Sequence, residues 1–221
     1  MNGRSRHAVA VTAVLLVAVV VGVAAVIAVV TATTTKVTTA SSGARASVVT
    51  QQPTTVKRIS PLNGQGHLKA RYAVVSSSRG YCWTTSFMNG RLYRCFRGNT
   101  IMDPCWKETG RHSVVCLLEP WSTNVHRLRL TRRLPATDTS AARLWGLRLG
   151  GGVGVNCLMS TGATGVVGKH PISYLCRRGW VLLGSPDRSR PLWTMLTAKQ
   201  VGTHYDLRGR KPLPTAWRAV R

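Results

Sequence analysis

The sequence predicts a mainly β protein with a single N-terminal transmembrane helix, a disordered tether and a small antiparallel β domain stapled by disulfides. Three observations support this prediction: an uncharged apolar run near the N-terminus, a Thr- and Ser-rich stretch after it, and short apolar runs separated by turn residues in the remainder. All six Cys and all seven Trp lie in that remainder, which therefore has the residues needed for a stapled core.

The apolar run at residues 8–30 is long enough to cross a membrane. Its 23 residues carry no charge, and as a helix they rise roughly 35 Å, against about 30 Å for the bilayer core. Arg4 and Arg6 precede it, and positive residues favour the cytoplasmic side. We therefore expect a single-pass protein of the cell membrane, with residues 1–7 in the cytoplasm, a signal anchor at 8–30 and the C-terminal part outside. The alternative is secretion after cleavage near Ala32, because small residues follow the run.

The rest of the chain divides by composition into three parts. Residues 31–67 are rich in Thr and Ser and have no apolar periodicity, which predicts a flexible tether. Residues 68–200 carry turn residues every 8 to 12 positions, the spacing of an extracytoplasmic β domain. Within it, Asp138 favours a short helix over 139–149 as an N-cap. Residues 201–221 hold two Pro and five basic residues, which predicts a basic C-terminal tail.

The six cysteines favour three disulfides, because an exported chain meets an oxidising environment. Fifteen pairings exist. Zinc is disfavoured, since the sequence has no C-x-x-C. The likeness of residues 93–98 to 174–179 suggests two related hairpins, each closed on itself. We therefore expect the following pairs: Cys82 with Cys95, Cys105 with Cys116, and Cys157 with Cys176.

Turn geometry supports the middle pair independently. If Cys105 faces Cys116, the central loop residues are Gly110 and Arg111, and Gly at the first position suits a type II′ turn. For the first pair, a turn at residues 89–90 places Cys95 opposite Thr84 instead of Cys82, unless a β-bulge intervenes.

The charge of the chain points to anionic partners. The sequence holds 31 Lys plus Arg against 6 Asp plus Glu, a formal net charge of +25. Without Arg4 and Arg6, 29 basic and six acidic residues remain, a net charge of +23 outside the membrane. Arg predominates, and its guanidinium group binds phosphate and carboxylate oxygens bidentately. The candidate anion contacts are Arg127, Arg129, Arg133, Arg177, Arg178, Arg188 and Arg190.

No catalytic, metal or cofactor set can be read from the sequence, and we expect none. The acids next to Pro, which include Asp103, Glu119 and Asp187, are typical of turns. The expected partners are the cytoplasmic membrane, through residues 8–30, and anionic wall polymers or lipid headgroups. Intracellular nucleic acid is disfavoured by the anchor. A non-enzymatic envelope module is therefore the favoured function, and the alternatives are an exported hydrolase of envelope material or a scaffold for other envelope proteins.

The stapled segments also resemble a known group of proteins. The motifs are Arg94-Cys95-Phe96, Met102 to Cys105, Val115-Cys116, Glu119-Pro120-Trp121, Gly154 to Cys157, Tyr174 to Cys176 and Gly184 to Thr194. Together they resemble uncharacterised exported proteins of actinobacteria over roughly residues 80 to 197. The resemblance implies an exported, cysteine-stapled domain behind a signal or anchor, and it implies no activity or catalytic residues.

Overall fold

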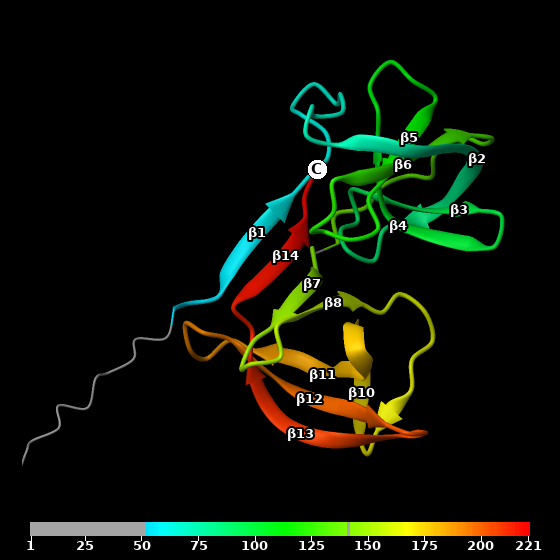
Figure 1. The fold of residues 1–221 in the computed structure, drawn as a ribbon. Coiled ribbons are helices and arrows are strands. Elements are labelled where there is room, and N and C mark those ends of the chain that lie inside the picture. The colour runs from blue at the N-terminus through cyan, green and yellow to red at the C-terminus, as the bar shows by residue number, and fades with distance from the viewer. Residues whose placement is uncertain (1–51, 141) are drawn as a thin grey trace, which may run out of the picture. The chain divides into compact units, whose positions relative to one another are not determined.

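The computed structural model describes residues 52–140 and 142–221, and it confirms the mainly β prediction (Figure 1). These residues form fourteen strands and one 3₁₀ turn, η1 (Arg177–Gly179), with no α-helix among them. They contain no helix long and apolar enough to cross a membrane. The predicted anchor at 8–30 and residues 31–51 of the predicted tether lie outside the described residues.

Five strands close into a barrel, and their bounds are β2 (Ala73–Thr85), β3 (Tyr93–Arg97), β4 (Thr100–Lys107), β5 (Ser113–Cys116) and β6 (Asn124–Leu130). Consecutive strands pair antiparallel, whereas β2 and β6 pair parallel, with Ala73 beside Asn124 and Gly80 beside Leu130. The reason is that the first and last of five alternating strands run in the same direction. The sequence predicts an antiparallel β domain. This prediction is wrong at the β2–β6 pairing, which is parallel.

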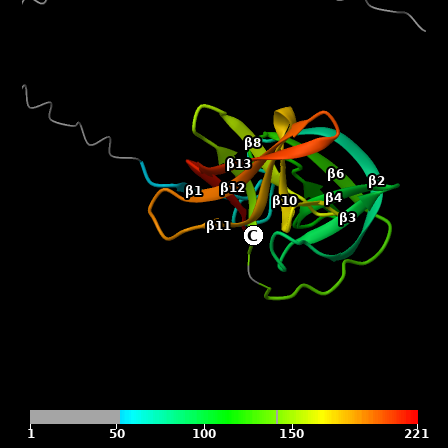
Figure 2. The same cartoon turned by 90° about the horizontal axis from the view of Figure 1, so that it is seen from below.

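The remaining strands form one nine-stranded sheet in the order β1-β14-β7-β8-β10-β11-β12-β13, with β9 paired to β10. Their bounds are β1 (Thr55–Ile59), β7 (Leu144–Leu149), β8 (Val155–Met159), β9 (Val166–Val167), β10 (His170–Cys176), β11 (Trp180–Asp187), β12 (Thr194–Val201), β13 (His204–Pro212) and β14 (Thr215–Ala219). Figure 2 shows the barrel strands gathered at one side and β11–β13 at the other.

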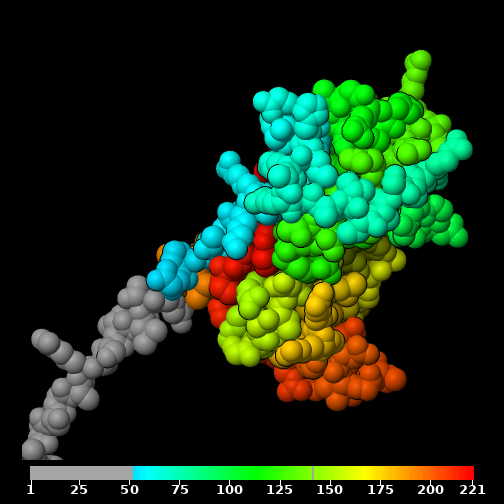
Figure 3. Space-filling model, turned by 45° about the horizontal axis from the view of Figure 1, so that its top comes forward, coloured from blue at the N-terminus to red at the C-terminus, as the bar shows by residue number. Residues whose placement is uncertain are grey.

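The two ends of the described chain pair with each other. β1 lies parallel to β14, with Thr55 beside Thr215 and Ile59 beside Ala219, and Figure 3 shows the cyan and red segments side by side. Backbone hydrogen bonds continue the pairing at both ends of the ladder, from Thr55 N to Pro214 O at 3.0 Å and from Val220 N to Ile59 O at 2.9 Å.

One apolar cluster joins the barrel to the sheet. It combines Trp106 and Leu117 of the barrel region with Ile59, Trp145 and Trp217 of the sheet. The rings of Trp106 and Trp145 lie 6.1 Å apart, and Trp106 donates its indole N–H to the carbonyl oxygen of Val220 at 2.6 Å. The barrel and the sheet therefore share one core. The buried Trp106 indole has its hydrogen-bond partner in Val220, which directly follows β14.

All three predicted disulfides are present, and no cysteine is free. Each bond joins residues that face one another in the strand register. The bulge invoked for the first pair exists, because the register shifts between Cys82 and Thr84. In the middle hairpin, Gly110 has a φ of +69°, the positive value predicted for the first loop position.

Three predictions for segments of the chain are wrong. The tether prediction of 31–67 fails at its end, because residues 55–59 form β1. The tail prediction of 201–221 fails, and the β domain does not end at 200, because β13 and β14 belong to the sheet. The helix prediction for 139–149 fails, because residues 144–149 form the strand β7, which is buried except at Arg148. Asp138 instead accepts a hydrogen bond from Ser140 N at 2.7 Å in a local turn.

The strand assignment of the C-terminal segment predicts unequal effects of two similar substitutions. Ala216 in β14 is fully buried, whereas Leu207 in β13 is 54% exposed. We expect Ala216→Asn to lower the free energy of unfolding by about 3 kcal/mol, through overpacking and an unpaired buried amide. Leu207→Asn should change it by less than about 1 kcal/mol. Urea denaturation measures both, and equal stabilities would indicate that this segment contributes nothing to the fold.

Candidate anion-binding site

A groove of about 710 Å³ lies where the barrel meets the paired ends of the described chain. Four segments line it: the end of β1 with the loop that follows (58–69), the start of β3 (91–93), the end of β4 with its turn (106–110), and residues 220–221. We call it the basic groove, because its lining includes Arg58, Lys69, Arg91, Lys107 and Arg221.

Local backbone bonds hold the 60–69 loop against the β4–β5 turn. Asn63 Oδ1 accepts hydrogen bonds from the backbone N–H groups of Gln65 and His67, at 3.1 and 2.9 Å, which closes the loop on itself. Thr109 N donates to Gly66 O at 3.1 Å across the gap. Gly66 has a φ of +79°, and a Cβ there would collide with the Thr109 side chain, so glycine is required for this approach.

The positive charges of the groove are mostly exposed and uncompensated. Arg58, Arg91, Lys107 and Arg221 are exposed, and none has an ion-pair partner within the described part of the chain. Lys69 is half-buried and donates to Ser60 O at 2.8 Å. Five like charges around one hollow raise the local concentration of anions.

Glu108 is the one acidic side chain among the described residues that line the groove, and it is neutralised by a neighbour. Arg127 forms a bidentate pair with it, at 2.9 Å from Nε to Oε2 and 2.8 Å from Nη2 to Oε1. Burial opposes ionisation of Glu108, but the hydrogen bonds from Arg127 and Ser113 and the charges of Arg127 and Arg111 outweigh it and lower the Glu108 pKa. The carboxylate therefore stays ionised and paired, and does not repel an incoming anion.

The predicted anion contacts do not converge. Arg127 and Arg129, on β6, line a second pocket described below, and Arg133 is exposed beyond that strand. Arg177 and Arg178 lie in η1, with Arg177 3.5 Å from Glu119. Arg188 and Arg190 lie between β11 and β12, with the Arg188 guanidinium over the Trp193 ring at 4.6 Å. The seven arginines thus occupy three separate regions, and none lines the basic groove.

Sequence reasoning missed all five cationic residues of the groove. They are spread over more than 160 positions, and only the pairing of β1 with β14 brings the ends together. No local motif signals a parallel pairing between two chain ends. The last strand has no period-two pattern that could have signalled it, because the neighbouring residues Ala216 and Trp217 are both buried.

A second polar cluster is buried in the barrel, away from both hollows. Asp103 accepts hydrogen bonds from the Ser86 hydroxyl and, at 3.2 Å, from Phe87 N. Arg94 lies over the Phe87 ring at 4.2 Å and donates to Thr161 O at 3.0 Å. Burial raises the Asp103 pKa to about 6, against the opposing effects of Ser86, Phe87 and Arg94. Asp103 is thus a buried residue of β4 and not the turn residue that the adjacent proline suggested.

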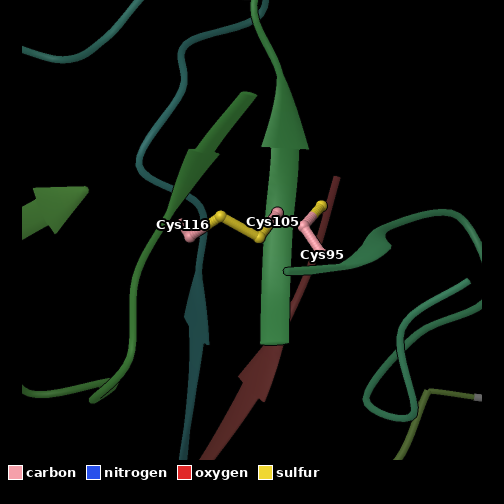
Figure 4. A group of neighbouring side chains, drawn as sticks. All are labelled: Cys95, Cys105 and Cys116. Carbon is pink, nitrogen blue, oxygen red and sulfur yellow. A yellow bond between two sulfur atoms is a disulfide. The ribbon is translucent and has the colours of Figure 1, made fainter. Parts of the chain in front are cut away.

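Three sulfur atoms form the remaining cluster. The sulfur atoms of Cys95, Cys105 and Cys116 all lie within 4.8 Å of one another. Figure 4 shows the disulfide between Cys105 and Cys116, with Cys95 beside it. A metal ligand has to be a free thiolate, and these three sulfurs are all held in disulfides. The cluster therefore consists of two neighbouring disulfides in the barrel core, Cys82–Cys95 and Cys105–Cys116.

The raised pKa of Asp103 predicts a pH dependence of stability. Its folded pKa of about 6 exceeds the ordinary Asp pKa of 3.8, so its contribution is fully present below pH 3.8 and is lost as pH rises through about 6. Relative to Asp103→Asn, the natural protein should lose about 2 kcal/mol of unfolding free energy between pH 4 and pH 7. Urea denaturation of both proteins across this range tests it, and a difference independent of pH would contradict the raised pKa.

Comparisons with known proteins add no assignment to this geometry. No protein-family model, no curated protein and no solved structure matches the chain.

Proposed function

We propose that this protein is an extracytoplasmic binding module that holds an anionic polymer of the cell envelope in its basic groove. The observation that carries the proposal is the convergence of five cationic side chains on one hollow whose lining acid is already paired. Residues 52–221 reinforce it with 27 basic and six acidic residues, a net charge of +21 once Arg4, Arg6, Lys36 and Arg45 are left out.

The shape of the site favours a polymer chain over a flat membrane surface. A lipid surface reaches protruding residues, whereas the groove is concave and includes Lys69, which is half-buried. A chain that enters the groove can contact its several cationic side chains together. Phosphate and carboxylate oxygens both accept bidentate hydrogen bonds from guanidinium groups, which matches the arginines of the lining.

The cysteine chemistry supports a location outside the cytoplasm. All six cysteines are in disulfides, and such bonds persist mainly in oxidising compartments. An anchor at residues 8–30, with the C-terminal domain outside the membrane, then brings the groove among the anionic polymers of the envelope.

Neutralising the groove should weaken polymer binding more than an equal loss of charge elsewhere. The triple variant Arg58→Gln, Arg91→Gln and Lys107→Gln removes three exposed cations of the groove, and the control Arg133→Gln, Arg178→Gln and Arg190→Gln removes three outside it. We expect the groove variant to bind a purified phosphate-linked wall polymer about tenfold more weakly or worse, because each lost contact is charge-assisted. The control should retain most of the affinity.

The same titration separates the competing interpretations. Binding should weaken as salt rises, since exposed charges are screened. Equal losses in the two variants would indicate diffuse charge attraction without a site. Preferential binding to phosphatidylglycerol vesicles over the polymer would overturn the choice of a polymer, and binding unaffected by salt would favour a protein partner instead.

The anchor has a direct test of its own. We expect protein extracted from membranes to retain residues 8–30, because this run exceeds the usual 7 to 15 residues of a cleavable signal core. Mass spectrometry of the intact chain measures this. A mature chain that begins near Thr33 would show cleavage and secretion instead.

A further inference from the structure

A second cationic pocket lies on the other side of the turn that borders the basic groove. This pocket, of about 440 Å³, is lined by Ser77, Arg111, His112, Ser113, Arg127, Arg129 and Leu130. Residues 106–110 of the β4–β5 hairpin line the groove, and residues 111–113 line the second pocket. The two hollows are therefore separated by a single hairpin turn.

The wall between the hollows is a fixed ion pair. Glu108 lines the groove, Arg127 lines the second pocket, and the two side chains form the bidentate pair described above. Ser113 donates a hydrogen bond to the same carboxylate at 2.6 Å. Because Glu108 is buried and held from two sides, this wall cannot present free negative charge to either hollow.

The crest of the turn is exposed and carries no negative charge. Thr109 and Gly110 are exposed, and nothing lies within 4 Å of the position that a Cβ on Gly110 would take. Arg111 follows directly and is exposed, and Arg129 is exposed on the far side of the second pocket. Among the described residues that line this pocket, none is acidic.

We propose that one linear polyanion crosses the β4–β5 turn and occupies the basic groove and the second pocket together. This inference rests on the proposed function and specifies its ligand as a chain with anionic groups repeated along its length. Once the groove holds one segment of such a chain, the next segment meets Arg111 and Arg129 at a high effective concentration. An isolated anion gains nothing from the second pocket, so the protein should discriminate by chain length.

The test compares probes of different length on matched variants. Orthophosphate, tripolyphosphate and long-chain polyphosphate are titrated at fixed salt into the full-length protein, with binding measured by calorimetry. Long chains should bind about 100-fold more tightly than tripolyphosphate. The double variant Arg111→Gln with Arg129→Gln should reduce the ratio of long-chain affinity to tripolyphosphate affinity about tenfold. Its affinity for tripolyphosphate should stay almost unchanged. The control, Arg133→Gln with Arg178→Gln, removes the same charge and should keep the ratio of the natural protein.

The possible failures can be told apart. If the Arg111 and Arg129 variant keeps the same ratio as the control, while the groove variant still weakens every probe, the crossing is overturned and the groove binding stands. If affinity does not depend on chain length, the crossing is likewise overturned. If no polyphosphate binds the natural protein at low salt, the crossing and the anion-binding function are both overturned.

Discussion

The parallel pairing of β1 with β14 is the contact on which the rest of the structure depends. It adds β1 to the edge of the sheet, places Ile59 and Ala219 in the shared core, and lets the Val220 carbonyl satisfy the buried indole of Trp106. It also delivers Arg58 and Arg221 to the same hollow. Packing and charge are thus coupled, because the residues that build the core at this junction are adjacent in sequence to those that line the groove.

Local patterns predicted the local structure well. The middle disulfide pair was predicted from hairpin register and the other two from the likeness of two segments, and all three pairs are present. The first pair was predicted to need a bulge, and the register shifts between Cys82 and Thr84. Patterns of this kind act over 10 to 20 residues, where loop closure and strand alternation leave a trace in the sequence. Strand alternation is also seen in β6, where Leu128 and Leu130 are buried and Arg129 between them is exposed.

Long-range pairings explain the errors. Nothing near residues 55–59 or 215–219 signals a partner 160 positions away, so polar composition predicted a tether and a tail where the chain forms strands. The same limit hid the basic groove, whose cationic residues come from four separate segments. The predicted arginines are grouped along the chain. Density along the chain does not measure convergence in space, and the structure distributes them over three regions.

The separation between β1 and β14 also bears on the order in which the chain can fold. β1 is made early, and its partner strand is made some 160 residues later, so β1 has an unpaired edge for most of synthesis. Such an edge invites association with other chains. Lys57 and Arg58 are exposed on this strand, and their charges disfavour that association until β14 arrives. The arginine that faces the groove in the folded protein thereby protects the nascent chain before the groove exists.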